Sequence, residues 1–95
     1  MNLNDEFEKH DDEYIKFDRI ENPRHPRPDL CAFLMLADLV PSDSGDIVTA
    51  AEHDEIYLAV DCEKLAAAAT SEHIRDLARC GVRYDESLDC LAMFV

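Results

Sequence analysis

The residues best suited to acid–base chemistry lie in the run Glu52–Glu55, which reads Glu-His-Asp-Glu. A histidine beside carboxylates suits a general base or a metal site, because its charge changes near neutral pH. The run falls between two strand-like segments, so we expect a turn whose successive side chains point in different directions. His25 and His73 lie far away in sequence and would reach His53 only through the tertiary fold. We therefore interpret His53 as an exposed turn residue and predict no metal site.

The thiols are the next candidates, and the chain has four of them: Cys31, Cys62, Cys80 and Cys90. None belongs to a Cys-x-x-Cys pair or has a histidine at zinc-finger spacing. Their apolar neighbours predict reduced, buried thiols. Arg75 and Arg79 precede Cys80 and would favour a thiolate there. However, we expect Cys80 at a helix C-terminus, where the helix dipole opposes a negative charge.

The remaining catalytic patterns are absent from the sequence. Ser44 lies near acids and Ser71 near a histidine, but no Gly-x-Ser-x-Gly sequence frames a nucleophile. Two glycines, Gly45 and Gly81, are too few for a phosphate-binding loop or a dinucleotide fingerprint. No calcium-binding loop pattern occurs either. We predict a non-enzymatic protein with no cofactor, and a small enzyme is the least favoured alternative.

Charge is the strongest signal in the chain. Its 95 residues include 22 acids and 9 bases, for a formal net charge of -13. This balance argues against direct nucleic-acid binding, which depends on Lys and Arg, and against docking on an anionic membrane. It favours a basic or nucleic-acid-binding protein as partner, drawn in by electrostatic steering. The partner-binding candidates are the acids of two predicted hairpins: Asp54, Glu55, Asp85, Glu86 and Asp89.

The hydrophobic pattern predicts the elements that position these acids. We expect helices over Asn4–Glu13, Leu30–Val40 with Asp29 as N-cap, Cys62–Ala69 with Asp61 as N-cap, and a further helix from Thr70 or Ser71 to Gly81. Tyr14–Ile20 fits an extended segment as well as it fits a helix. We expect extended backbone over Asn22–Pro28, and strands over Asp46–Ala51, Glu55–Val60, Val82–Tyr84 and Leu88–Phe94. Tight connections within each strand pair imply antiparallel hairpins. The predicted fold is α+β, a small antiparallel sheet of two hairpins with helices packed on one face.

The composition changes near Pro28. Residues 1–28 read as an acidic N-terminal segment ending in a Pro-rich linker, and residues 29–95 as a compact α+β domain. Six residues of the second part should be deeply buried: Phe33, Leu36, Leu58, Val60, Leu77 and Phe94. The run Leu30–Val40 is apolar on nearly every side, so it should be central or lie at an interface. An oligomer built on this helix, with the acidity only solubilising it, is the main alternative function.

Three stretches carry a resemblance to other proteins: His25–Leu30, Ala51–Ile56 and Arg79–Asp85. In these the chain resembles small proteins of unknown function encoded by bacteriophages and prophages. The resemblance implies a bacterial cytoplasm and an accessory role, and it implies no chemistry. A phage-encoded inhibitor that imitates the charge of DNA is the most specific form of the interaction hypothesis. The lack of a secretory signal in Met1–Asp12 and of any apolar run of ~20 residues also predicts a cytoplasmic protein.

Overall fold

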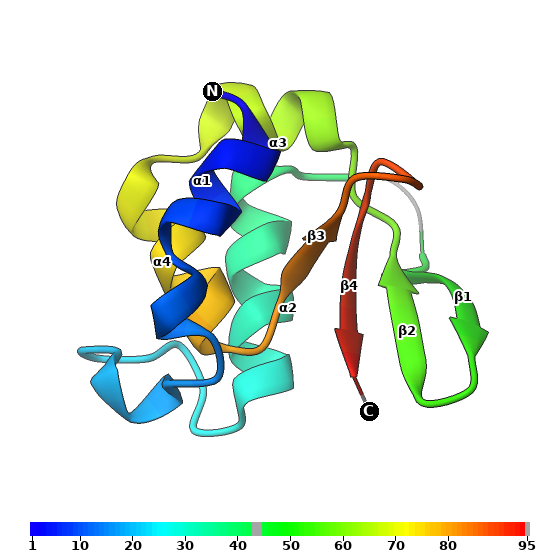
Figure 1. Ribbon diagram of the computed structural model, residues 1–95. Coiled ribbons are helices and arrows are strands. Elements are labelled where there is room, and N and C mark those ends of the chain that lie inside the picture. Colours follow the sequence, from blue (N-terminus) through cyan, green and yellow to red (C-terminus); the bar gives the residue numbers. More distant parts are fainter. Residues whose placement is uncertain (43–44, 95) are drawn as a thin grey trace.

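The computed structural model describes residues 1–42 and 45–94, so Ser44 lies outside the described residues. The helices are α1 (Leu3–Lys9), α2 (Pro28–Leu39), α3 (Cys62–Ala68) and α4 (Ser71–Arg79), with 3-10 turns η1 (Asp11–Glu13) and η2 (Phe17–Arg19). The strands are β1 (Val48–Glu52), β2 (Glu55–Leu58), β3 (Arg83–Asp85) and β4 (Cys90–Phe94). Figure 1 shows the helices gathered on one side of the sheet, and the β1–β2 hairpin at the end of the sheet farthest from them.

The four strands form one antiparallel sheet in the order β1-β2-β4-β3. The two hairpins join through β2 and β4, in a register that pairs Glu55 with Phe94 and Leu58 with Leu91. The predicted α+β fold of two hairpins with helices on one face is therefore confirmed. Since β2 and β4 are antiparallel, the turns of the two hairpins lie at opposite ends of the sheet.

The core lies between the sheet and the helices. Leu36 of α2, Leu58 of β2 and Leu77 of α4 are buried as predicted, while Phe33 and Val60 are only half-buried. The prediction for Phe94 was wrong, because its side chain is 58% exposed. Alternation along β4 turns Leu91 and Met93 inward and Phe94 outward, where the Arg83 guanidinium lies 4.5 Å from its ring centre.

The N-terminal segment packs on the rest of the chain. Leu3 is buried in the core, and Phe7, Phe17 and Ile20 pack against it. The backbone N–H of Ile15 donates to the carbonyl of Ala78 at 3.0 Å. Over Tyr14–Ile20, which the sequence left open between extended backbone and helix, the chain forms η2, and Phe17 and Ile20 pack against the core.

Local capping explains most helix ends. The side chain of Asp61 accepts a hydrogen bond from the N–H of Lys64, and Thr70 caps α4 in the same way through His73. Gly81 follows α4 with φ of 94°, a conformation that favours glycine. The start of α2 differs from the prediction.

The helix α2 begins at Pro28, with Arg27 as its N-cap. A proline suits the first helical position because its missing N–H is not needed there. Asp29 thus lies inside the first turn, where its carboxylate accepts from the N–H of Leu30 at 2.9 Å. The preceding segment is not uniformly extended as predicted, since Asn22 has φ of 50° and several residues up to Arg27 form bends.

Within residues 1–42 and 45–94, no helix combines the length and apolar character needed to cross a membrane.

Candidate functional site

The structure divides the five predicted partner-binding acids between two ends of the sheet. Asp54 lies in the β1–β2 turn and Glu55 begins β2, whereas Glu86 and Asp89 lie in the β3–β4 turn, next to Asp85. When the antiparallel register of β2 and β4 is extended, Asp89 lies opposite a position about six residues after Asp54. At ~3.4 Å per residue the two groups are about 20 Å apart. They therefore do not form one cluster.

Three of these five acids have partners within the protein. Glu55 forms an ion pair with Arg83 and accepts a hydrogen bond from the hydroxyl of Tyr57 at 3.1 Å. Asp89 accepts from the Tyr84 hydroxyl at 2.6 Å. Asp85 accepts from the Ser87 hydroxyl and from two backbone N–H groups of its turn. These bonds, above all that from Ser87, lower the pKa of Asp85.

Asp61, which the sequence analysis did not select for partner binding, belongs with the acids of the β3–β4 turn. Burial, and then the charges of Asp89, Cys90 and Asp61, raise the pKa of Cys62 to about 11. The hydrogen bond to Asp89, with burial and the charge of Glu86, raises the pKa of Tyr84 to about 12. Asp89 acts on both side chains, so the β3–β4 turn, which also carries Glu86, lies beside the start of α3 at Asp61. We call Asp61, Glu86 and Asp89 the acidic end. The N-cap pattern at Asp61 was visible in the sequence, but its position beside a distant turn was not.

The basic residues are mostly neutralised by acids of the same chain. Seven of the nine Lys and Arg side chains form an ion pair with Asp or Glu, and the seven are Lys9, Arg19, Arg24, Arg27, Arg75, Arg79 and Arg83. The most enclosed of these pairs joins Arg79 of α4 to Glu13 at 2.9 Å, with both side chains less than a fifth exposed. Among residues 1–42 and 45–94, fifteen acids are exposed: Asp5, Glu8, Asp11, Asp12, Asp18, Glu21, Asp38, Asp46, Glu52, Asp54, Asp61, Glu63, Glu72, Glu86 and Asp89. The charge presented to solvent is therefore mainly negative.

The candidate acid–base groups are not assembled for catalysis. His53 is exposed in the β1–β2 turn with φ of 55°. In the part of the chain that is described, no group of three or more His, Cys, Asp or Glu side chains could hold a metal ion. His10 lies near both Ser71 and Glu6, but the same Nε2 atom contacts the Ser71 hydroxyl at 3.0 Å and the Glu6 carboxylate at 3.8 Å. A relay needs its carboxylate on the other ring nitrogen, so this contact does not activate Ser71.

The thiols are arranged for packing. The four cysteines are free; Cys31, Cys62 and Cys80 are buried, and Cys90 is half-buried. Burial is the main cause that raises the pKa of Cys80, and contact with Cys31 adds to it. A thiol with a raised pKa holds little thiolate near neutral pH, which is the reverse of an activated nucleophile.

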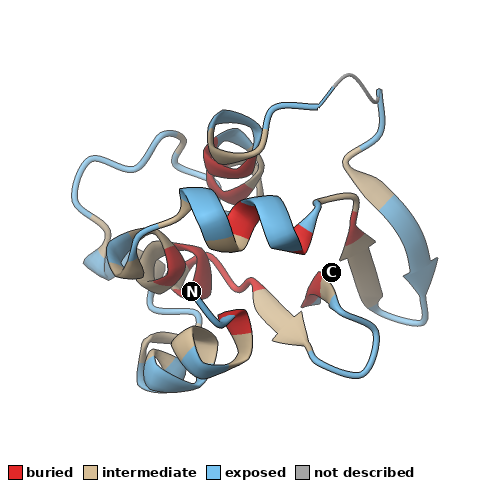
Figure 2. Cartoon of the chain, turned by 90° about the horizontal axis from the view of Figure 1, so that it is seen from above, coloured by how far each residue is buried: buried red, intermediate tan, exposed pale blue. Residues whose placement is uncertain are grey.

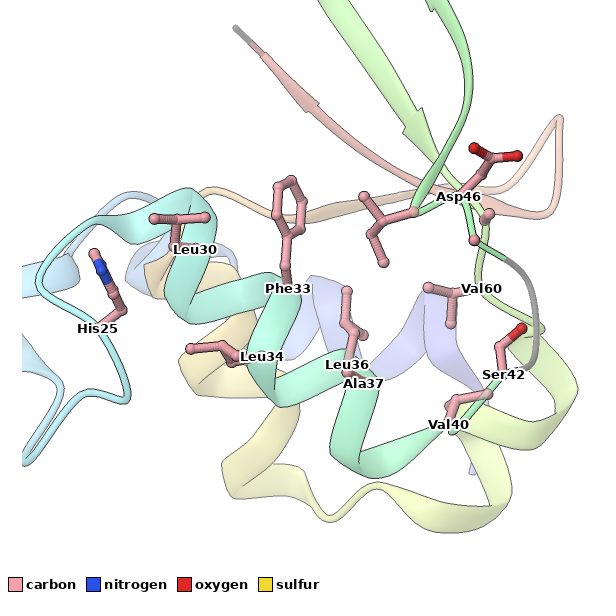
Figure 3. Close-up of a pocket in the computed structure, with 13 residues that line it drawn as sticks. His25, Leu30, Phe33, Leu34, Leu36, Ala37, Val40, Ser42, Asp46 and Val60 are labelled. Carbon is pink, nitrogen blue, oxygen red and sulfur yellow. The ribbon is translucent and has the colours of Figure 1, made fainter.

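An apolar hollow with a volume of about 510 Å³ lies beside α2. Figure 3 shows four of the lining residues along the helix: Leu30, Phe33, Leu34 and Ala37. The Phe33 ring points toward the strands, whereas Leu34 points away from them, toward the side of His25. Val60 also lines this hollow. The polar side chains that line it are few: His25, Ser42 and Asp46. Its volume is within the ~300–1,000 Å³ of ligand-binding pockets.

A second hollow of about 510 Å³ adjoins the first, with Phe33 lining both. Val48, Ile56 and Met93 contribute to it from three strands of the sheet. We call the two hollows together the α2 groove. The groove exists because the helices lie under β3 and β4, while the β1–β2 hairpin extends beyond them (Figure 1). The sequence predicted an interface role for Leu30–Val40, but not the opposing wall.

Comparison with known proteins found no matching family model, curated protein or solved structure.

Proposed function

We propose that this protein is a non-enzymatic interaction protein that binds a basic protein, in particular one whose basic surface normally contacts nucleic acid. The observation that supports it is the charge left after internal pairing. Most cations of the chain are held in ion pairs, while fifteen of the acids that the structure describes are exposed. A field of one sign accelerates encounter with an oppositely charged partner and discriminates against others.

The scale of this charge is close to that of DNA. The molecule measures 29 × 27 × 27 Å and carries a formal charge of -13. Duplex DNA of that length carries about 17 charges, at one per ~1.7 Å. The most specific form of the proposal is therefore an inhibitor that occupies the DNA-binding surface of its partner, encoded by a phage and acting in the bacterial cytoplasm.

The acidic end is the best location for the first contact. The β3–β4 turn with Glu86 and Asp89 lies beside Asp61 there, and all three acids are exposed. Asp54 and Glu55 lie at the other end of the sheet, and Glu55 is already paired with Arg83. We expect these two to contribute to long-range attraction more than to direct contact.

The test is affinity capture from a bacterial lysate, followed by competition with duplex DNA. Basic DNA-binding proteins should be captured, displaced by the duplex, and released as salt rises from about 0.1 M to about 1 M, where the screening length falls from ~10 to ~3 Å. A triple variant, Asp61→Asn, Glu86→Gln and Asp89→Asn, should capture less. Asparagine still caps a helix and still accepts a hydrogen bond, so the fold is preserved.

The matched control removes the same number of charges from exposed positions of the N-terminal segment, by Glu8→Gln, Asp11→Asn and Asp12→Asn. A general effect of net charge predicts equal losses in the two triple variants. Capture that is insensitive to salt, or that shows no preference for basic proteins, would refute the proposal. Equal losses with salt-sensitive capture would keep the basic partner and reject the acidic end as its contact.

A further inference from the structure

We infer that the α2 groove binds an apolar side chain of the partner, presented on a segment that carries Lys or Arg on either side of it. This inference rests on the proposed function for the charge of the partner. It adds a second, apolar contact on a different part of the molecule, and thereby states what the partner must carry besides positive charge.

The groove is built from side chains that the fold leaves without a cover. Leu34 is 46% exposed in the middle of α2, and Phe33 beside it is only half-buried. The second hollow, which Phe33 also lines, is bounded by the half-buried Val48 and Ile56 of the β1–β2 hairpin. Apolar side chains that face one another across a hollow gain free energy when a third apolar group displaces the water between them.

The charges around the groove select among occupants. Among the described residues that line the two hollows none is Lys or Arg, whereas two are acids: Asp46, and Asp29, which is ion-paired with the exposed Arg27. The acids Glu52 and Asp54 are exposed at the tip of the hairpin that forms one wall. Basic residues on either side of an apolar anchor would therefore meet acids.

A second copy of this chain is a poor occupant by the same reasoning. It would bring a further charge of -13 toward a groove whose charged lining residues are acids. Like charges juxtaposed across an interface oppose association, so self-pairing here is disfavoured. The apolar side chain that enters the groove is therefore expected to come from a different, basic protein.

The groove, and not the open edge of the sheet, is the surface that fits this role. The outer edge of β1 has a bulge, since the pairing register shifts between Val48 and Ala50. The hydroxyl of Thr49 at this point donates to the carbonyl of Tyr57 at 3.3 Å. A bulged edge interrupts the ladder of hydrogen bonds that an added strand would need.

The test is selection of binders from a library of random short peptides on the immobilised protein. The enriched peptides should contain a Leu, Ile, Phe or Trp flanked by Lys or Arg. For the best peptide, the double variant Leu34→Gln and Ala37→Gln should weaken binding at least about tenfold, as expected when an anchor loses its pocket. Both positions are exposed on the helix surface, so the fold should survive.

The matched control is Leu88→Gln, which removes a 58% exposed leucine from the β3–β4 turn, away from the groove. It should leave peptide affinity unchanged. If the enriched peptides are basic but have no apolar anchor, and Leu34→Gln binds them as well as the wild type does, the groove is not the binding site and the proposed function still stands. Anchored peptides without basic residues would overturn the basic partner. A groove-dependent dimer seen by analytical ultracentrifugation, or no enrichment at all, would overturn this inference.

Discussion

Two leucines of α2 provide a sharp test of how this helix divides between the core and the groove. Leu36 is 1% exposed and Leu34 is 46% exposed, although they are only two residues apart. Leu36→Ala removes buried methyl groups and leaves a cavity, at a cost of ~3 kcal/mol within the usual range of 2–5. Leu34→Ala removes a side chain that is half in water, and alanine is at least as good a helix former, so its effect should stay within ~0.5 kcal/mol.

The predicted difference is large on the scale of the whole domain. A chain of 95 residues has a free energy of unfolding of about 5–14 kcal/mol, so Leu36→Ala should remove a substantial fraction of it. At ~4–8 °C per kcal/mol, its melting temperature should fall by about 12–24 °C. Urea unfolding and thermal unfolding, both followed by far-UV circular dichroism, give the free energy of unfolding and the melting temperature.

Equal destabilisation by the two substitutions would refute the assignment of Leu34 to an open groove. It would mean that Leu34 is covered in solution, by a second copy or by a rearranged hairpin. Repeating the measurement over a range of protein concentrations separates these explanations, because only an oligomer has a concentration-dependent midpoint.

Two more predictions concern the N-terminal segment. The hydrogen bond from Arg79 lowers the pKa of Glu13 below its usual 4.5. The ionised Glu13 therefore stabilises the fold above its unfolded pKa, and this stability is lost as the pH falls through the folded pKa. The melting temperatures of the wild type and Glu13→Gln should differ at pH 7 and converge below pH 4.5. Convergence at higher pH would contradict this ion pair. Deleting residues 1–21 removes Leu3, Phe7 and Phe17 from the core and should lower the melting temperature of the remaining chain, and an unchanged melting temperature in calorimetry would show that residues 29–95 hold the whole cooperative unit.

The sequence predicted the order of elements because each one carries a local signal. Asp61 and Thr70 cap α3 and α4 as expected, and Gly81 ends α4 with positive φ. The tight connections within the two hairpins were enough to indicate an antiparallel sheet with helices on one face. The sequence did not reveal which hydrophobic residues face inward at the end of a strand, so Phe94 was assigned to the core in error.

The sites were less predictable, because they depend on distances between segments. The acids of the two turns could be recognised as exposed, but their separation along the sheet follows from the β2–β4 register alone. The internal partners of Glu55 and Asp89 are likewise tertiary contacts, to Arg83 and to the Tyr84 hydroxyl. The α2 groove requires two walls, and the helical pattern of residues 30–40 describes only one of them.

The open edge of β1 has a consequence for the behaviour of the protein at high concentration. The edge strand Val48–Glu52 has one charged residue, Glu52, and its remaining side chains are small or β-branched, so mutual repulsion between whole molecules does most to keep two such edges apart. That repulsion vanishes near the isoelectric point of about 4.4, which lies close to the pKa of ordinary carboxylates. At that pH the bulge at Thr49 is the main remaining obstacle to pairing between the β1 strands of two molecules. Colloidal stability at mildly acidic pH thus depends on one irregular residue in an exposed strand.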